Sequence, residues 1–254
     1  MADVLRSDLL QRHGFVHGFS LRTGGVSEEP YASLNLGRTV GDTPRAVAEN
    51  MVRFARSVGF DAERLFEVSQ VHGARTLPVR PGAVPQALRI EQADAMVATA
   101  PDVAVAIRVA DCVPVLMADP RSGAVAAAHA GWRGCVAGVV PAALRALQHE
   151  AGARPAEVLV ALGPHIRVGA FEVGDEVAER LEQAAPAAHA VLRGAGKPRV
   201  DLSRVLRAQL AAAGVPDGHV DDVGGCTYAE PERFFSYRRD GQRSGRHLGA
   251  IARR

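Results

Sequence analysis

Two histidines and one cysteine stand at the ends of apolar segments, and their side chains are of the kinds that bind transition metals or transfer protons. His72 closes one such segment, Cys112 lies between two others, and His129 closes a fourth. The intervals between the three residues are far longer than the roughly two to five residues that separate paired ligands in zinc fingers. We therefore expect these side chains to meet only through the fold.

Three ligand-type side chains are the number that a catalytic zinc site takes from the protein, whereas structural zinc usually takes four. The fourth position of a catalytic site holds water, whose pKa the metal lowers to about 7. A thiolate from Cys112 and neutral imidazoles from His72 and His129 thus predict a metal that polarises a substrate or activates water. The residues leave a structural alternative open, in which the cysteine fills a core and the histidines cap strand ends.

Arginines near glycine-rich turns are candidates for binding an anion. Arg133 lies just before an expected helix start, where main-chain N–H groups and the positive helix end favour phosphate. Arg22 and Arg238 are further candidates, although each one taken singly could be a solvated surface charge. Trp132, the single tryptophan, could stack on a planar base or fill the core.

The spacing of apolar residues predicts four helices that must position these side chains. The clearest follows Thr43 and Pro44, carries an apolar stripe, and ends at Gly59 in a left-handed conformation. Three more are expected over residues 136–150, over 175–185, and from Asp201 as the N-terminal cap.

Apolar runs between these helices predict the strands. Several runs are apolar at consecutive positions, which is typical of strands covered on both faces. The strands come in clusters and do not alternate regularly with helices, so we expect a mixed-sheet α/β fold, layered as an α-β-β-α-like sandwich. The expected strands are residues 15–21, 65–71, 93–98, 103–109, 113–117, 124–129, 158–162 and 247–251.

Composition limits the classes of partner. The chain has 254 residues, is 47% hydrophobic, and has 30 Lys and Arg against 28 Asp and Glu, for a net charge of +2. Such a balance favours neither nucleic acid nor a membrane surface as a partner. No secretory signal is recognised at the N-terminus, so we expect a cytoplasmic protein. Three widely separated cysteines favour reduced thiols over a disulfide framework.

Eight short motifs, in order along nearly the whole chain, closely resemble the YfiH family. That family has been labelled polyphenol oxidase or laccase domain, peptidoglycan editing factor and purine nucleoside phosphorylase. The motifs are Ser-Leu-Arg-Thr-Gly-Gly-Val-Ser (20–27), Ser-Leu-Asn-Leu-Gly (33–37), Gly-Asp (41–42), Val-Ala-Glu-Asn (47–50), Ser-Gln-Val-His-Gly (69–73), Ala-Asp-Cys (110–112), His-Ala-Gly-Trp-Arg-Gly (129–134) and Phe-Phe-Ser-Tyr-Arg-Arg-Asp-Gly (234–241).

The resemblance implies a single YfiH-like catalytic domain over residues 1–254 that binds zinc through His72, Cys112 and His129. It implies phosphorolysis of adenosine, inosine, guanosine and S-methyl-5′-thioadenosine to the base and ribose 1-phosphate, and deamination of adenosine. We expect a monomer or weak homodimer whose partners are purine nucleosides and phosphate, with no nucleic acid and no membrane. The residues expected to bind substrate or phosphate are Arg22, Asn35, Gln70, Arg133 and Arg238.

One position departs from the family pattern, because His165 stands where members often carry cysteine. The residues also leave other functions open. Cys112 could act as a nucleophile, with His72 or His129 as its base, and cleave an amide in a peptidoglycan precursor. Copper-dependent phenol oxidation is disfavoured, because none of the nine histidines forms a His-x-His pair. A binding module without activity is a further alternative.

Overall fold

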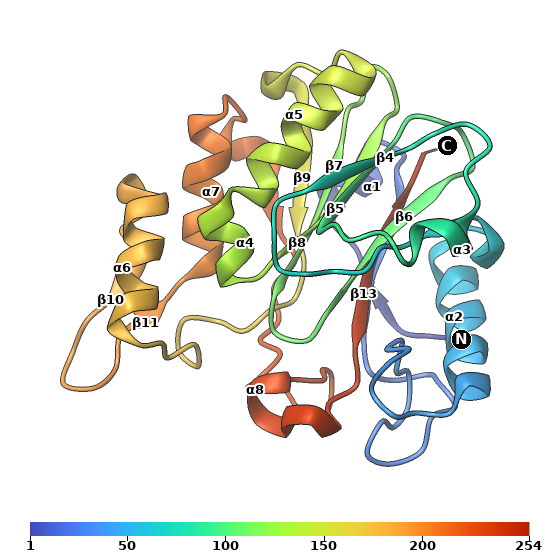
Figure 1. Cartoon of the computed structure of the whole chain (residues 1–254), viewed down its shortest axis with the longest axis horizontal. Coiled ribbons are helices and arrows are strands. Elements are labelled where there is room, and N and C mark those ends of the chain that lie inside the picture. The colour runs from blue at the N-terminus through green and yellow to red at the C-terminus, as the bar shows by residue number, and fades with distance from the viewer. Residues whose placement is uncertain (254) are drawn as a thin grey trace.

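Two β-sheets lie face to face, with helices on both outer sides, in the computed structural model, which describes residues 1–253 (Figure 1). The first sheet has five strands in the order β1-β2-β13-β6-β3, and the second has six in the order β12-β9-β7-β8-β5-β4. A separate two-stranded sheet pairs β10 with β11. Both large sheets mix parallel and antiparallel pairs, because β3 runs parallel to β6, β4 to β5, and β12 to β9. The fold is thus the mixed α/β sandwich that the sequence predicts.

The strands of the first sheet are β1 (Val4–Leu5), β2 (Val16–Ser20), β3 (Leu65–Phe66), β6 (Ala104–Val109) and β13 (His247–Ala252). Those of the second are β4 (Thr76–Val79), β5 (Ala95–Ala98), β7 (Val113–Ala118), β8 (Val125–Ala130), β9 (Leu159–Leu162) and β12 (Val220–Asp222), while β10 (Val191–Leu192) and β11 (Arg199–Val200) form the small sheet.

Helices cover the outer face of each large sheet. The helix α2 (Pro44–Val58) packs on the five-stranded sheet, and α4 (Trp132–Ala137), α5 (Val139–Ala151) and α7 (Leu202–Ala212) lie on the other side, with α6 (Asp175–Ala184) against α4 (Figure 1). Shorter helices are α1 (Asp8–Arg12), α3 (Pro85–Leu88) and α8 (Tyr237–Asp240). Across residues 1–253, none of the helices has the length and apolar character needed to span a bilayer.

Alternating side chains along the central strands enter different apolar layers. In β7, Val115 packs in the layer beneath α5 and α7, whereas Leu116 packs between the two sheets. In β6, Ile107 faces the space between the sheets, and Ala106 faces α2. These strands are apolar at consecutive positions because both of their faces are buried.

The helix over 44–58 is confirmed in detail. The side chain of Thr43 caps its first turn by accepting a hydrogen bond from the main-chain N–H of Ala46, and Gly59 ends it at φ 108°. The single helix expected over 136–150 is wrong, because Gly138 at φ 74° divides it into α4 and α5, and α4 begins earlier, at Trp132.

The strand expected over 65–71 is also shorter, since β3 holds only Leu65–Phe66. Beyond it, Glu67 turns its carboxylate toward arginines and Ser69 makes a single bridge to Gln92. Elements such as β1, β12 and α8, of two to four residues, were not expected from the sequence because they are too short to show a period.

Candidate active site

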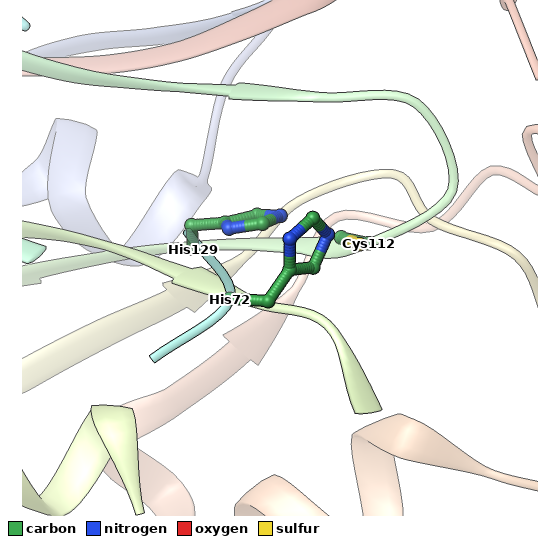
Figure 2. A group of neighbouring side chains, drawn as sticks. All are labelled: His72, Cys112 and His129. Carbon is green, nitrogen blue, oxygen red and sulfur yellow. The ribbon is translucent and has the colours of Figure 1, made fainter. Parts of the chain in front are cut away.

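His72, Cys112 and His129 meet at one end of the sandwich, and their possible ligand atoms all lie within 4.8 Å of one another (Figure 2). His72 lies in the loop between β3 and β4, Cys112 in the turn between β6 and β7, and His129 on β8. The two imidazole rings are 4.8 Å apart between centroids and inclined by 70°. Among residues 1–253 no other group of three His, Cys, Asp or Glu side chains is placed to hold a metal ion.

Unusual backbone conformations bring two of the segments to this point. The turn that holds Cys112 passes from the five-stranded sheet to the six-stranded one, and Asp111 adopts φ 86° there. His72 adopts φ 61° in its loop. Positive φ is costly for residues other than glycine, so the surrounding contacts must hold it. The carboxylate of Asp111 accepts hydrogen bonds from the Thr227 hydroxyl and the main-chain N–H of Arg238, so Asp111 fixes the turn.

Asp94 is the buried carboxylate that holds the other two segments. Its oxygens accept hydrogen bonds from the main-chain N–H groups of Val71, His72 and Gly73, at 3.1, 2.9 and 2.7 Å. Oδ1 also lies 2.8 Å from Nδ1 of His129. Because an ionised carboxylate can only accept, Nδ1 of His129 keeps a proton, and Nε2 is the nitrogen that can bind a metal once its own proton is displaced. Burial alone would raise the pKa of Asp94, but these hydrogen bonds, led by that of His129, lower it.

In the metal-free chain, the thiol of Cys112 and the imidazole of His129 shift each other's pKa. Burial would raise the pKa of Cys112, but the charge and hydrogen bond of His129, and then His72, lower it to about 6. Burial would lower the pKa of His129, but the Cys112 thiolate and Asp94 raise it to about 9. At neutral pH Cys112 is therefore a thiolate, the form that binds metals. By contrast, burial raises the pKa of Cys135, which stays a neutral core thiol.

Gly131 keeps space open beside the three ligands. A Cβ added at this position would lie 2.8 Å from Sγ of Cys112 and 3.2 Å from Cδ2 of His72. One thiolate and two imidazoles form a donor set that suits zinc and similar metals of intermediate softness. The residues present therefore fit a metal ion held by three protein ligands.

A pocket of about 690 Å³ opens over these ligands and is strongly cationic. Six arginines line it against two carboxylates, those of Glu67 and Asp111. Phe171 and Tyr237 add aromatic surface. Such a pocket favours an anionic ligand with an apolar, planar part. The arginines are Arg38, Arg89, Arg108, Arg133, Arg238 and Arg246.

Three of the five residues predicted to bind substrate line this pocket together with the metal ligands. Arg133 stacks its guanidinium over the Trp132 ring at 4.4 Å, and Arg238 stacks over Phe171 at 5.3 Å. Gln70 also lines the pocket, but its side-chain amide donates to the main-chain carbonyl of Arg108 and accepts from the main-chain N–H of Arg108, both at 2.7 Å. It acts there as a brace between loop and strand.

The other two predicted residues are not among those that line the pocket. Arg22 donates hydrogen bonds to the carbonyls of Ala32 and Pro231, because the irregular segments around it leave these acceptors unpaired by any sheet. Asn35 is fully buried and accepts a hydrogen bond from the main-chain N–H of Arg246. Both side chains stabilise loops through these hydrogen bonds, and Asn35 positions the segment that carries Arg246, which lines the pocket.

His165, the departure from the family pattern, is buried away from the pocket lining. Its Nδ1 donates to the carbonyl of Gly163 at 2.8 Å, and its Nε2 lies 2.9 Å from Oγ of Ser203. Burial lowers the pKa of His165 to about 4, so it is neutral. These contacts give it a structural place in the core.

Sequence reasoning missed Asp94 and Glu67, which are 0% and 2% exposed. Both fall inside segments read as apolar strands, and a charged residue in such a strand is costly to bury unless it is paired. That mismatch was the signal that could have found them. The additional pocket arginines gave no signal, because the chain has 30 Lys and Arg in all.

Comparison with known proteins shows what the chain resembles. The profile of the family described as "Multi-copper polyphenol oxidoreductase laccase" matches residues 16–254. A protein of Streptomyces coelicolor named purine nucleoside phosphorylase is 44% identical over 240 residues, covering 94% of this chain and 96% of that protein. The crystal structure of YlmD from Geobacillus stearothermophilus superposes with a TM-score of 0.88 at 35% identity, over 95% of this chain and 92% of that one. That of YfiH from Bacillus licheniformis does so with a TM-score of 0.86 at 31% identity, over 94% and 92%.

Proposed function

The chain belongs to the family described as multi-copper polyphenol oxidoreductase laccase, the YfiH family, and on that premise we propose that it is a zinc-dependent purine nucleoside phosphorylase. The proposed substrates are adenosine, inosine, guanosine and S-methyl-5′-thioadenosine, with deamination of adenosine as a second activity. The observation that carries the proposal is the meeting of His72, Cys112 and His129 inside an arginine-lined pocket. Relatives named purine nucleoside phosphorylase support the substrate class.

The metal would be held by the thiolate of Cys112, Nε2 of His129 and a ring nitrogen of His72. When bound, zinc supplies a Lewis acid with one exchangeable position. Asp94 keeps His129 in the required tautomer and holds the loop that carries His72. The protein thus fixes two ligands through one carboxylate.

Phosphorolysis joins a phosphate oxygen to C1′ of the ribose while the bond from C1′ to the purine nitrogen breaks and its electron pair leaves with the base. The pocket arginines would bind the phosphate dianion and hold it against C1′. Phe171 and Tyr237, which line the pocket, offer aromatic surface for the purine. Asp111 is committed to Thr227 and a main-chain N–H, so we assign it no proton transfer.

The test is to incubate the purified, zinc-loaded protein with adenosine, with and without inorganic phosphate, and to identify the products. Adenine and ribose 1-phosphate should form only with phosphate, and inosine should form in either case. The His129→Ala variant is the matched inactive control. Adenosine left unchanged under both conditions would contradict the proposal.

The arrangement of Cys112, His129 and Asp94 favours one alternative, a thiol-dependent amidase acting on a peptidoglycan precursor. The lowered pKa of Cys112 and the orientation of His129 by a carboxylate are what such a nucleophile needs. Metal content separates the two functions. Amidase activity that survives chelation and is lost in Cys112→Ser would favour the thiol mechanism over the phosphorylase.

A further inference from the structure

Glu67 gathers three arginine side chains at one wall of the pocket. Its carboxylate lies 3.2 Å from Nη2 of Arg38 and 3.8 Å from Nε of Arg89, and it accepts a hydrogen bond from Nη2 of Arg108. All four residues line the pocket that contains the metal ligands. One carboxylate thus faces three guanidinium groups, and two positive charges are left without a partner of opposite sign in the group.

The three arginines are held so that they keep part of their surface toward the pocket. Their side chains are 32%, 31% and 20% exposed for Arg38, Arg89 and Arg108, whereas that of Glu67 is 3% exposed. Nε of Arg108 donates to the carbonyl of Leu36 at 2.8 Å, which fixes its direction. The carboxylate is therefore more deeply buried than the guanidinium groups. The N–H groups of the arginines that do not bind Glu67 or a carbonyl stay free for a ligand.

Among the three arginines around Glu67, Arg89 has the charge and the N–H groups that neighbouring atoms compensate least. Its Nε is buried and finds no hydrogen-bond partner among residues 1–253. Burial lowers the pKa of Arg89, and the charge of Arg38 lowers it further. A buried donor without an acceptor is costly, so Glu67 compensates Arg89 only in part. An anion bound against the exposed part of this side chain would offset the remaining charge.

The remaining pocket arginines have a different environment. Arg133, Arg238 and Arg246 each lie over an aromatic ring, at 4.4, 5.3 and 5.5 Å, whereas the arginines around Glu67 make no such contact within the described chain. The pocket therefore has one region of stacked planar groups and one of paired charges. Both regions line the one pocket that also contains the three metal ligands.

Building on the proposed function, we propose that Arg38, Arg89 and Arg108 form a subsite for a phosphate dianion, with Glu67 as their positioning residue. Guanidinium forks match the oxygens of a phosphoryl group in pairs, which lysine cannot reproduce. Inorganic phosphate and the 5′-phosphate of a nucleotide share this chemistry. The subsite would hold the anion in the same pocket as the metal ligands and leave the stacked region for the purine.

Calorimetric titration of the zinc-loaded protein with inorganic phosphate tests the subsite directly. Arg89→Gln should weaken phosphate binding about tenfold or more, since a charge-assisted contact is lost. Arg89→Lys should recover only part of that affinity. Arg145→Gln removes the same charge from an exposed position of α5 outside the pocket and should change nothing.

The same titration with adenosine and with adenosine 5′-monophosphate identifies the source of the phosphate. If inorganic phosphate is the ligand, its affinity falls in Arg89→Gln and that of adenosine does not. If a nucleotide is the ligand, the affinity for the monophosphate falls in the variant and the wild type prefers it to adenosine. Either result supports the subsite.

Phosphate and monophosphate affinities that are absent in the wild type, or equal in the wild type, Arg89→Gln and Arg38→Gln, would overturn the subsite. The outcome is independent of turnover. Phosphorolysis with an unchanged KM for phosphate, together with an unchanged affinity for the monophosphate in Arg89→Gln, would reject the subsite and keep the enzyme. Phosphate binding that depends on Arg89 in a protein without phosphorolysis would keep the subsite and reject the enzyme.

Discussion

Oδ1 of Asp94 lies 2.8 Å from Nδ1 of His129, and the same buried carboxylate accepts a hydrogen bond from the main-chain N–H of His72. One side chain therefore positions two proposed metal ligands that are far apart in the chain. Carboxylates bonded to ligating histidines fix the ring orientation and strengthen the ligand.

Replacing Asp94 should weaken metal binding although no ligand is removed. Asp94→Asn has nearly the same shape, but its amide group turns a donor toward groups that are themselves donors. We expect zinc affinity to fall by about 10- to 100-fold, the usual effect of losing such a partner. Competition with a chromophoric chelator measures it. Asp8→Asn, an exposed change on α1, is the control, and equal zinc affinity in all three proteins would refute the role of Asp94.

Gly131→Ala should obstruct the metal site by its volume alone. The backbone at Gly131 has φ −76°, which alanine adopts readily, so the fold should survive. The added methyl group would lie 2.8 Å from Sγ of Cys112. We expect loss of most bound zinc and of turnover.

Gly174→Ala is the matched control for this change. Gly174 is the N-cap of α6, as Gly131 is of α4, and it has nearly the same φ of −74°. A Cβ added at Gly174 would meet no atom within 4 Å. Zinc content by elemental analysis should fall in Gly131→Ala and stay constant in Gly174→Ala. Full zinc content in both variants would show that the space beside Cys112 is not needed.

Cys112 should be reactive at unusually low pH in the metal-free protein. Its pKa, lowered to about 6 chiefly by His129 against the effect of burial, means that the thiolate fraction rises as pH passes through 6. The rate of alkylation by iodoacetamide, followed by mass spectrometry of the Cys112 peptide, should reach half its maximum near that pH. His129→Ala should move the midpoint upward, and zinc should protect the thiol. A midpoint near 8.5 in the unmodified chain would contradict the pairing.

Stability should fall as the solution is acidified from neutral pH. Burial lowers the pKa of His165 to about 4 and that of His247 to about 3, and it lowers that of His17 as well. Between about pH 4 and 6.5 the unfolded chain binds more protons at these histidines than the folded chain, so the free energy of unfolding decreases as pH falls. Each histidine contributes up to about 1.4 kcal/mol per pH unit.

Urea unfolding between pH 7.5 and 5 measures this dependence. His165→Gln should reduce the slope of stability against pH by up to one proton. A free energy of unfolding that does not change over this range would show that the buried histidines become charged without cost.

Local patterns were enough to predict most of the fold. The apolar stripe after Thr43 indicates a helix buried on one face. The consecutive apolar residues around Val115 indicate a strand buried on both faces. The division of a helix at Gly138 could not be foreseen, because a left-handed glycine inside an apolar pattern is decided by tertiary packing.

The site was less accessible to prediction. His72, Cys112 and His129 stand out by chemical type, but Asp94 shows its role only when two segments meet at its carboxylate. Arg22 looked equivalent to the pocket arginines, since sequence does not record which carbonyls a guanidinium will satisfy.

X-ray absorption at the zinc edge of the loaded protein tests the central claim most directly. Coordination by Cys112, His72 and His129 predicts one sulfur at about 2.3 Å and two imidazole nitrogens at about 2.0 to 2.1 Å from zinc. The sulfur shell should vanish in Cys112→Ser. A spectrum without sulfur, or with two or more sulfur ligands, would contradict a metal held by these three side chains.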